Sequence, residues 1–518
     1  MVTTISEALR DAANKYADLA AVRFPDREVS FAELNRQSDA VAAYLLSQGV
    51  NKGDRIALYC PNSDAFAAIH TGIIKAGAVV VPLNLLHNPK ELAYIANDAG
   101  IRGLFYHPVF AEQTAAFSAE LSTLEFKVVI ALESETDEPT LAQVLATSTE
   151  DDDVVPVEAE DPAVILYTSG TTGHPKGAVL THHNLVSNTG SVVRALQLEP
   201  GKDTLLVVLP MFHAFAATVG VLTPLMHGLT IAPVPKFEPQ LVTDVVEATK
   251  ATIFLGVPSM YNLLSRIPEE QVARWSNIRF GVAGGAAMPV ELIKRFEERF
   301  GFPILEGDGP TECSPVTCVN PLDGVRKPGS VGLEIPDVEI SIMDDAGNQL
   351  PVDEIGELCV RGPNIMKGYW NLPEETAEVF FGEWLRTGDL GYKDADGYIF
   401  MVDRKKDMVI VNGMNVYPRM IEEVLYQHPA VMEVAVVGEP HGSHGEIPVA
   451  YVVVREGESV DSAALKTFCR DHLAQYQMPR KFFFTDALPK NATGKILKRE
   501  LRKQGELERG VDSRTKSE

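Results

Sequence analysis

The sequence predicts an α/β protein with a large N-terminal domain and a small C-terminal domain. Over roughly the first three hundred residues, short β-branched runs alternate with helical patterns, which is typical of parallel sheets covered by helices. After about Pro328 the apolar runs become shorter and are separated by Asp- and Gly-containing turns, which is typical of antiparallel β structure. The chain has 518 residues and is 45% hydrophobic, so it can bury several cores.

The N-terminal alternation predicts two βαβ-type sheet subdomains. The expected strands are residues 55–59, 78–82, 127–131, 204–209, 252–256 and 278–283. The expected helices are residues 65–76, 239–248 and 289–300. Pro289 is expected in the first helical turn, where the missing N–H of a proline costs no hydrogen bond.

A small β subdomain is expected next in the chain. Residues 344–347 and 394–397 combine Asp, Ala and Gly in patterns that favour tight turns. The charged run at residues 403–407 then forms a bridge to a separate small domain. We therefore assign residues 1–402 to the N-terminal domain and residues 403–518 to the C-terminal domain.

The C-terminal domain is expected to be an α+β unit. The pattern predicts that the charged run is followed by a helix at residues 418–427 and then by strands at 431–437 and 449–454. His441 and His444 have a spacing seen in metal sites, but they lie between the two strands without further nearby ligands and are interpreted as loop residues. The charged tail after about Gly505 has a composition typical of disorder.

Charge and cysteine content narrow the functional classes. The formal net charge is −25, which argues against a broad nucleic-acid-binding surface. The five cysteines form no Cys-x-x-Cys pair, so buried, reduced thiols are expected rather than disulfides or a zinc site.

Residues 207–235 lack charged side chains, but their prolines and histidines argue against a membrane span. The N-terminus lacks the pattern of a signal peptide, so a cytoplasmic location is expected.

The strongest local signal is a glycine- and threonine-rich loop at residues 168–177, directly after a hydrophobic strand at 163–166. Glycines allow backbone N–H groups to approach phosphate oxygens, and hydroxyl groups add further donors. Lys176 adds positive charge, but its spacing from Gly173 differs from that of a Walker loop. The alternative is a flexible turn. The expected phosphate-binding residues are Thr168, Ser169, Gly170, Thr171, Thr172, Gly173 and Lys176.

This loop resembles the signature of the adenylate-forming enzymes, the superfamily of acyl-CoA synthetases, luciferases and peptide-synthetase adenylation domains. Further motifs match the superfamily in order at residues 309–312, 386–389, 403–407 and 489–495, so the resemblance covers nearly the whole chain. It implies that ATP activates a carboxylic acid as an acyl-adenylate, that coenzyme A then takes the acyl group, and that Mg²⁺ takes part.

The resemblance also implies roles for single residues. Glu312 corresponds to the Mg²⁺ ligand, and a carboxylate suits that cation. Asp389 corresponds to the carboxylate that binds the ribose hydroxyls, and Arg404 to an arginine on the ribose and phosphate side. Lys495 would bridge the attacking carboxylate and the phosphate, although its basic neighbours also fit a solvated helix. The expected catalytic residues are Lys495, Glu312, Thr168 and His213, and the expected nucleotide-site residues also include Gly284, Gly285, Ala286, Asp308, Gly309 and Thr311.

The acyl-adenylate must form in a site that excludes water, and it must then react with a thiol that enters from outside. A single static pocket meets these two requirements poorly. Rotation of the C-terminal domain about Asp403 would withdraw Lys495 and present Gly413, which would leave room for the pantetheine arm of CoA. A glycine turn between a strand and a helix explains Gly413 equally well.

Asp308 departs from the superfamily pattern, which usually has an aromatic residue that stacks on adenine at this position. The Asp308 carboxylate could accept a hydrogen bond from the adenine amino group. Weaker binding of ATP and preference for another nucleotide are the alternatives.

The acyl group is expected to enter an apolar pocket. Candidate walls at residues 211–215, 256–261 and 284–288 carry no permanent charge, which suits an uncharged tail. Amino-acid-activating relatives usually have Phe-Asp where this chain has Phe212 and His213, which argues against an amino acid. His213 would gate the channel or contact the carboxylate, or it is a structural histidine. The amino-acid sequence at residues 209–215, 284–289 and 402–418 most resembles that of medium- to long-chain fatty acyl-CoA synthetases.

Several alternatives stay open at this point. The substrate could be an aryl acid, the acceptor a carrier protein or an amine, or the chain a non-catalytic nucleotide-binding regulatory protein. A luciferase-like oxygenase and a dinucleotide-binding oxidoreductase are weaker alternatives. Peripheral membrane contact and a homodimer are also compatible with the sequence.

Overall fold

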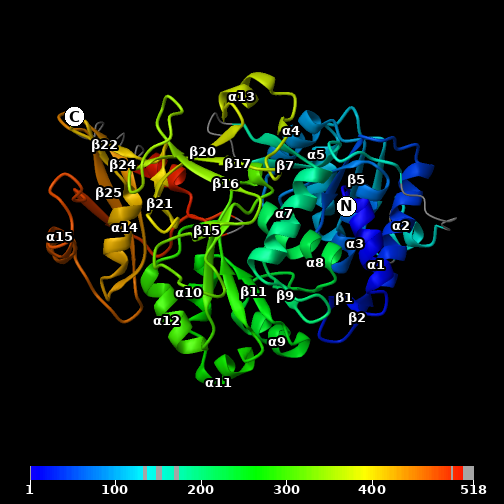
Figure 1. Cartoon of the computed structure of the whole chain (residues 1–518), viewed down its shortest axis with the longest axis horizontal. Coiled ribbons are helices and arrows are strands. Elements are labelled where there is room, and N and C mark those ends of the chain that lie inside the picture. Colours follow the sequence, from blue (N-terminus) through cyan, green and yellow to red (C-terminus); the bar gives the residue numbers. More distant parts are fainter. Residues whose placement is uncertain are drawn as a thin grey trace.

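The structure is a computed structural model that describes residues 2–131, 133, 137–147, 155–168, 174–491 and 494–505. The expected phosphate-loop residues Ser169, Gly170, Thr171, Thr172 and Gly173, and the tail after Gly505, lie outside the described residues. Figure 1 shows the large N-terminal domain at the centre and right, and the smaller α+β C-terminal domain at the left.

The larger sheet of the N-terminal domain has nine strands in the order β15-β14-β13-β12-β11-β9-β10-β1-β2. The pairs from β13 to β1 are parallel, and the strands at both edges are antiparallel. Every residue of β9, β11 and β12 is buried, as expected for central strands of a parallel sheet. The strands are β1 (Ala20–Arg23), β2 (Glu28–Ser30), β9 (Thr204–Val207), β10 (Thr230–Pro233), β11 (Ile253–Gly256), β12 (Phe280–Ala283), β13 (Ile304–Asp308), β14 (Cys318–Val319) and β15 (Leu333–Glu334).

The second sheet has seven strands in the order β18-β8-β7-β4-β3-β5-β6 and is parallel from β7 to β6. Its strands are β3 (Arg55–Tyr59), β4 (Val79–Pro82), β5 (Gly103–Tyr106), β6 (Phe126–Val129), β7 (Pro162–Thr168), β8 (Lys176–Thr181) and β18 (Gly368–Tyr369). The two sheets confirm the predicted pair of βαβ-type subdomains.

Helices of the N-terminal domain lie between and around these sheets (Figure 1). Helix α4 shows why they begin and end where they do: Asn88 and Glu91 form a capping box, and Gly100 ends the helix in the left-handed conformation. The helices are α1 (Ile5–Lys15), α2 (Phe31–Ser47), α3 (Asp64–Lys75), α4 (Pro89–Ala99), η1 (Pro108–Phe110), α5 (Ala111–Ser118), α6 (Leu141–Leu145), α7 (His182–Ala195), η2 (Ala216–Leu222), α8 (Thr223–His227), α9 (Pro239–Thr249), α10 (Pro258–Leu264), α11 (Glu269–Val272), η3 (Ala273–Trp275), α12 (Val290–Phe300), η4 (Thr311–Cys313) and α13 (Pro373–Glu378).

The predicted small β subdomain is an antiparallel sheet in the order β16-β17-β20-β19, with β21 paired to β20. Its strands are β16 (Glu339–Met343), β17 (Gly356–Arg361), β19 (Phe380–Phe381), β20 (Trp384–Lys393) and β21 (Ile399–Arg404). Strand β21 ends at the start of the predicted hinge.

The C-terminal domain packs α14 and α15 with a sheet in the order β23-β22-β25-β24, with β26 added beside β25. Its elements are β22 (Val409–Val411), β23 (Met414–Val416), α14 (Pro418–Tyr426), β24 (Val431–His441), β25 (Gly445–Val454), α15 (Ser462–Arg470) and β26 (Lys481–Phe484).

Several local expectations need correction. The hinge does not lead directly into a helix, because the β22–β23 hairpin intervenes, and the turn with Gly413 therefore joins two strands. Pro289 caps α12 from outside the helix with extended backbone angles. Strands β24 and β25 extend further than predicted and meet at the turn that holds His441 and His444.

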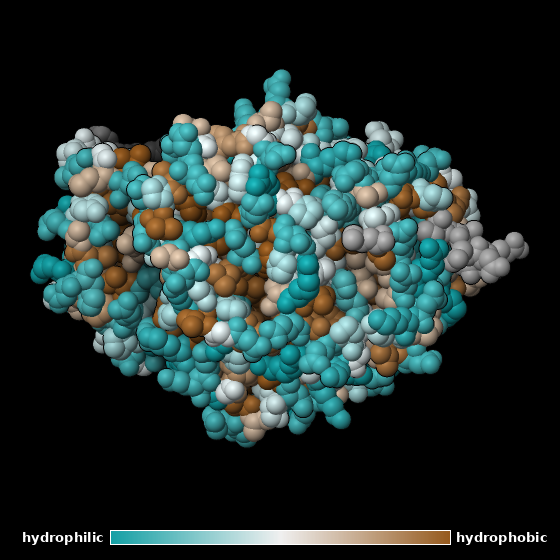
Figure 2. Space-filling view, in the orientation of Figure 1, coloured by the Kyte–Doolittle hydropathy of each residue, from teal (hydrophilic) through white to brown (hydrophobic). Residues whose placement is uncertain are grey.

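Other expectations are confirmed in the described part of the chain. All five cysteines are buried and free. Residues 207–235 are divided among β9, η2, α8 and β10, and none of the described helices is long and apolar enough to cross a membrane. Hydrophilic side chains cover most of the face seen in Figure 2.

Candidate active site

Strands β7 and β8 carry the two described ends of the phosphate loop. Thr168 and Lys176 are opposite each other in the antiparallel ladder of β7 and β8. The Thr168 hydroxyl lies 3.5 Å from Oε1 of Glu312, which η4 contributes from the other large subdomain. The structure thus brings Thr168, Lys176 and Glu312 together.

Tyr369 completes this cluster and was missed from the sequence. Its hydroxyl donates to Oε1 of Glu312 at 2.9 Å, and Nζ of Lys176 lies 5.3 Å from the centre of its ring. Burial and the neighbouring Glu312 raise the pKa of Tyr369 above its usual value, so the phenol stays protonated and can donate. The local sequence, Gly368–Tyr369, does not show where this tyrosine lies. Only the pairing of β18 with β8 shows its position.

The expected adenine end lies where β12 and β13 finish side by side. Gly284, Gly285 and Ala286 follow β12, and Gly285 has a φ of +75° that favours glycine. Asp308 ends β13, and a β-carbon on Gly309 would lie 1.8 Å from the carbonyl oxygen of Pro315. The carboxyl ends of neighbouring parallel strands form the usual position for a nucleotide in such sheets.

Asp389 and Arg404 face each other across β20 and β21, with Nε of Arg404 3.0 Å from Oδ1 of Asp389. Both lie close to Asp308. Burial, followed by the charge of Asp389, raises the pKa of Asp308 to about 6, whereas Arg404 and Lys495 oppose that shift. Asp308 therefore carries its negative charge above about pH 6.

Lys495 reaches this cluster from the C-terminal domain. Burial, followed by repulsion from Arg404, lowers the pKa of Lys495 to about 8, while Asp389 and Asp308 oppose the shift. The preceding Gly494 has a φ of +78°, and a β-carbon there would lie 2.3 Å from Oγ of Ser259. The loop therefore docks tightly onto the start of α10.

His213 connects the charged cluster with an apolar pocket. Burial, followed by repulsion from Lys495, lowers the pKa of His213 to about 4, so the imidazole is neutral at pH 7. The pocket has an empty volume of about 600 Å³, part of it open to solvent. Beyond Asp308, His213 and Thr311, its described lining consists of apolar side chains, glycines and Cys318.

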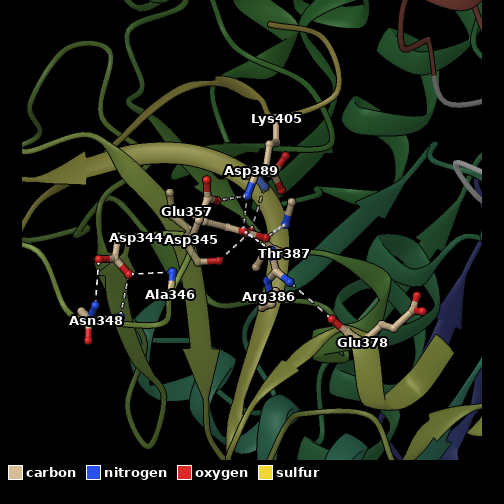
Figure 3. A network of polar contacts seen from close by, with 12 residues as sticks. Asp344, Asp345, Ala346, Asn348, Glu357, Glu378, Arg386, Thr387, Asp389 and Lys405 are labelled. Carbon is tan, nitrogen blue, oxygen red and sulfur yellow. Dashed lines mark hydrogen bonds and ion pairs between the residues drawn. The ribbon is translucent and has the colours of Figure 1, made fainter. Parts of the chain in front are cut away.

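A buried carboxylate, Glu357 on β17, holds the part of β20 that carries Asp389 (Figure 3). It is 4% exposed and accepts from Nη2 of Arg386 at 2.9 Å, from the Gly388 N–H at 3.2 Å and from Nζ of Lys405 at 3.1 Å. Glu357 was also missed, because a single glutamate in a strand carries no local signal.

Gly413 stands apart from the other predicted residues. It lies in the β22–β23 turn with a φ of +79° and open space around the position of a β-carbon. Strand β22 lies at the left edge of the molecule, away from β7 and α7 (Figure 1). In this domain arrangement Gly413 is not part of the site.

Comparisons with known proteins agree with this geometry. The sequence model described as "AMP-binding enzyme" matches residues 9–370, and that described as "AMP-binding enzyme C-terminal domain" matches residues 420–495. A long-chain-fatty-acid–CoA ligase of Bacillus subtilis is 34% identical over 527 residues, covering 96% of this chain and 94% of the relative. A feruloyl-CoA synthase of an Amycolatopsis species is 37% identical over 485 residues, covering 93% and 95%.

Among solved structures, ATP-bound MatB from Rhodopseudomonas palustris superimposes with a TM-score of 0.89 at 33% identity, covering 96% of this chain and 98% of that chain. The match spans both domains. The chain therefore belongs to the AMP-binding enzyme family and is an AMP-forming acid–thiol ligase of the acyl-CoA synthetase type.

Proposed function

We propose that this enzyme activates a medium- or long-chain fatty acid with ATP and transfers the acyl group to coenzyme A, releasing pyrophosphate and AMP. The observation that carries the proposal is the apolar pocket that His213 and Asp308 help to line. Its other described walls include Val192, Leu196 and Ile335 and offer no cation to a second carboxylate or other polar tail. The names of relatives such as the Bacillus subtilis ligase support the same substrate class.

The charged residues near His213 and Asp308 suit attack of a carboxylate on the α-phosphate of ATP. Lys495 would neutralise the attacking carboxylate and the phosphate together, while Asp389 would hold the ribose hydroxyls. Neutral His213 would contact the acid at the mouth of the pocket without adding a charge. Thr168, Lys176 and the loop between them would hold the departing pyrophosphate.

The residues present fit a Mg²⁺ ion that is shared with the nucleotide. Glu312 offers a carboxylate, with the Thr168 hydroxyl beside it, and no group of three or more His, Cys, Asp or Glu side chains in the described chain forms a dedicated metal cage. Mg²⁺ is commonly held by one or two carboxylates plus substrate phosphates. It would supply charge neutralisation at the phosphates.

The second half-reaction would use another domain arrangement. We place the boundary near Asp403, with residues 1–402 and 403–518 as the two domains. Rotation about the following residues would withdraw Lys495 and bring the turn at Gly413 to the acyl-adenylate. The open space around Gly413 supports its use against the slim pantetheine arm.

Pyrophosphate release with purified enzyme, ATP and Mg²⁺ tests the proposal over acids from hexanoate to stearate, with ferulate and benzoate as aryl acids. Thioester formation is followed in parallel with and without coenzyme A. We expect the fatty acids to give the highest kcat/KM. Preference for ferulate would instead assign an aryl acid, as the name of the Amycolatopsis relative would suggest. Release without thioester formation would point to another acceptor, and no release with any acid would contradict acid activation.

A further inference from the structure

Helix α14 of the C-terminal domain inserts an arginine against the N-terminal domain. The Arg419 side chain is 13% exposed, and its Nη2 lies 3.8 Å from Oε1 of Glu306. Glu306 lies on β13, two residues before Asp308, and is 2% exposed. Neither residue belongs to the motifs that assign the chemistry.

Glu306 is a buried carboxylate that the N-terminal domain satisfies only in part. Its Oε1 accepts the N–H of Met288 at 3.0 Å, whereas its Oε2 has no hydrogen-bond partner among the described residues. Burial raises the pKa of Glu306 to about 7, and Arg419 opposes this shift. A buried charge that loses its partner is strongly destabilised, so the contact favours the docked position of α14.

Two more contacts hold α14 near this position. The backbone N–H of Arg419 donates to Oδ2 of the hinge residue Asp403 at 2.9 Å. One helical turn further on, the carboxylate of Glu423 lies near the backbone N–H of Val290 at the start of α12. Contacts between α14 and the N-terminal domain would separate if the C-terminal domain rotated about the residues after Asp403.

We propose that Arg419 is a positioning residue for adenylation: by pairing with Glu306, it stabilises the domain arrangement that places Lys495 in the active site. This inference rests on the proposed two-step function. The pair stabilises only the docked arrangement, so its loss reduces the fraction of molecules that have Lys495 in place. The thioester-forming step, which uses the other arrangement, does not need the pair.

The test compares the two half-reactions in Arg419→Met, Glu306→Gln and the double variant. Glu306→Gln keeps an oxygen for the Met288 N–H but removes the charge. Adenylation is measured by pyrophosphate–ATP exchange, and thioester formation from supplied acyl-adenylate. We expect each single variant to slow adenylation on the order of tenfold and to spare thioester formation. The double variant should be no slower than the singles, because both remove one interaction.

Met420→Ala is the matched control, because Met420 lies on the same helix and is 45% exposed. It should leave both half-reactions unchanged, and Arg419→Lys should restore part of the adenylation rate. Thermal unfolding identifies any variant that has simply lost its fold. Equal loss in both half-reactions, or additive effects in the double variant, would overturn the role of Arg419.

A conformational readout separates this inference from the proposed chemistry. Fluorescence energy transfer between dyes on the two domains of the full chain should show a larger undocked fraction in Arg419→Met than in wild type. An unchanged distribution would refute the inference whatever the substrate is. Absence of both half-reactions in wild type would instead refute the proposed function, while the conformational comparison would still decide on Arg419.

Discussion

Gly494 of the C-terminal domain packs against Ser259 of the N-terminal domain so closely that a β-carbon on Gly494 would lie 2.3 Å from the serine Oγ. Its φ of +78° also disfavours any other residue. Because Lys495 follows directly, this contact sets how deeply the lysine reaches into the site.

Gly494→Ala should slow adenylation on the order of a hundredfold, because the added methyl group displaces the loop and small misplacements of a reacting group are costly. Thioester formation from supplied acyl-adenylate should change little. Gly457→Ala is the matched control: Gly457 has a φ of +82° in the same domain, but nothing lies within 4 Å of its β-carbon position. Equal effects of both substitutions would assign the loss to backbone strain alone.

The pH profile of adenylation should report Lys495. Its pKa is lowered to about 8, so raising the pH through 8 removes the proton that neutralises the carboxylate and phosphate. The kcat/KM for pyrophosphate–ATP exchange, which reflects the free enzyme, should therefore fall above about pH 8. Lys495→Arg should move this limb to higher pH, and a limb that stays in place would contradict the assignment.

Asp308 should weaken ATP binding at acidic pH. Its pKa is raised to about 6, so the carboxylate is charged above this value and loses its charge as the pH falls through it. If it accepts the adenine amino group, the KM for ATP should rise below pH 6, and Asp308→Asn should flatten this dependence. Inosine triphosphate lacks the amino group and is the control. The same pH dependence with both nucleotides would argue against contact with the base.

Glu357→Ala should weaken both the fold and the ribose site. It would leave the cations of Arg386 and Lys405 without their shared buried carboxylate, which should lower the free energy of unfolding by about 3 kcal/mol in denaturant titrations. The KM for ATP should rise, because the part of β20 that carries Asp389 loses its anchor. Asp345→Ala removes the other partner of Lys405, is 86% exposed, and should change stability by less than about 1 kcal/mol.

His444 should affect the binding of coenzyme A and should not affect formation of the acyl-adenylate. Its carbonyl accepts the Asn412 N–H at 2.8 Å, and its Nδ1 lies 2.9 Å from the Asn412 side-chain oxygen, so it holds the turn next to Gly413. His444→Ala should raise the KM for coenzyme A several-fold and leave pyrophosphate–ATP exchange unchanged. His441→Ala removes the ring that stacks on His444 but leaves the bonds to Asn412, so it should have a smaller effect. A change in exchange would show a different role for this turn.

The sequence determined the features that arise from short-range order. Buried apolar runs such as β3 follow from patterns a few residues long, and the order of motifs from Thr168 to Lys495 indicated the chemistry. Strand boundaries did not follow from local patterns, because the extension of β24 and β25 depends on pairing between strands and not on their own composition.

Tertiary structure alone decided which distant residues meet. Tyr369 contacts Glu312 because β18 pairs with β8, and Arg419 contacts Glu306 because α14 docks against β13. A tyrosine, an arginine and a glutamate each have an ordinary role on a protein surface, and their sequence neighbours do not distinguish that role from a buried one. Burial and pairing, which move pKa values and make an ion pair depend on domain position, exist only once the chain has folded.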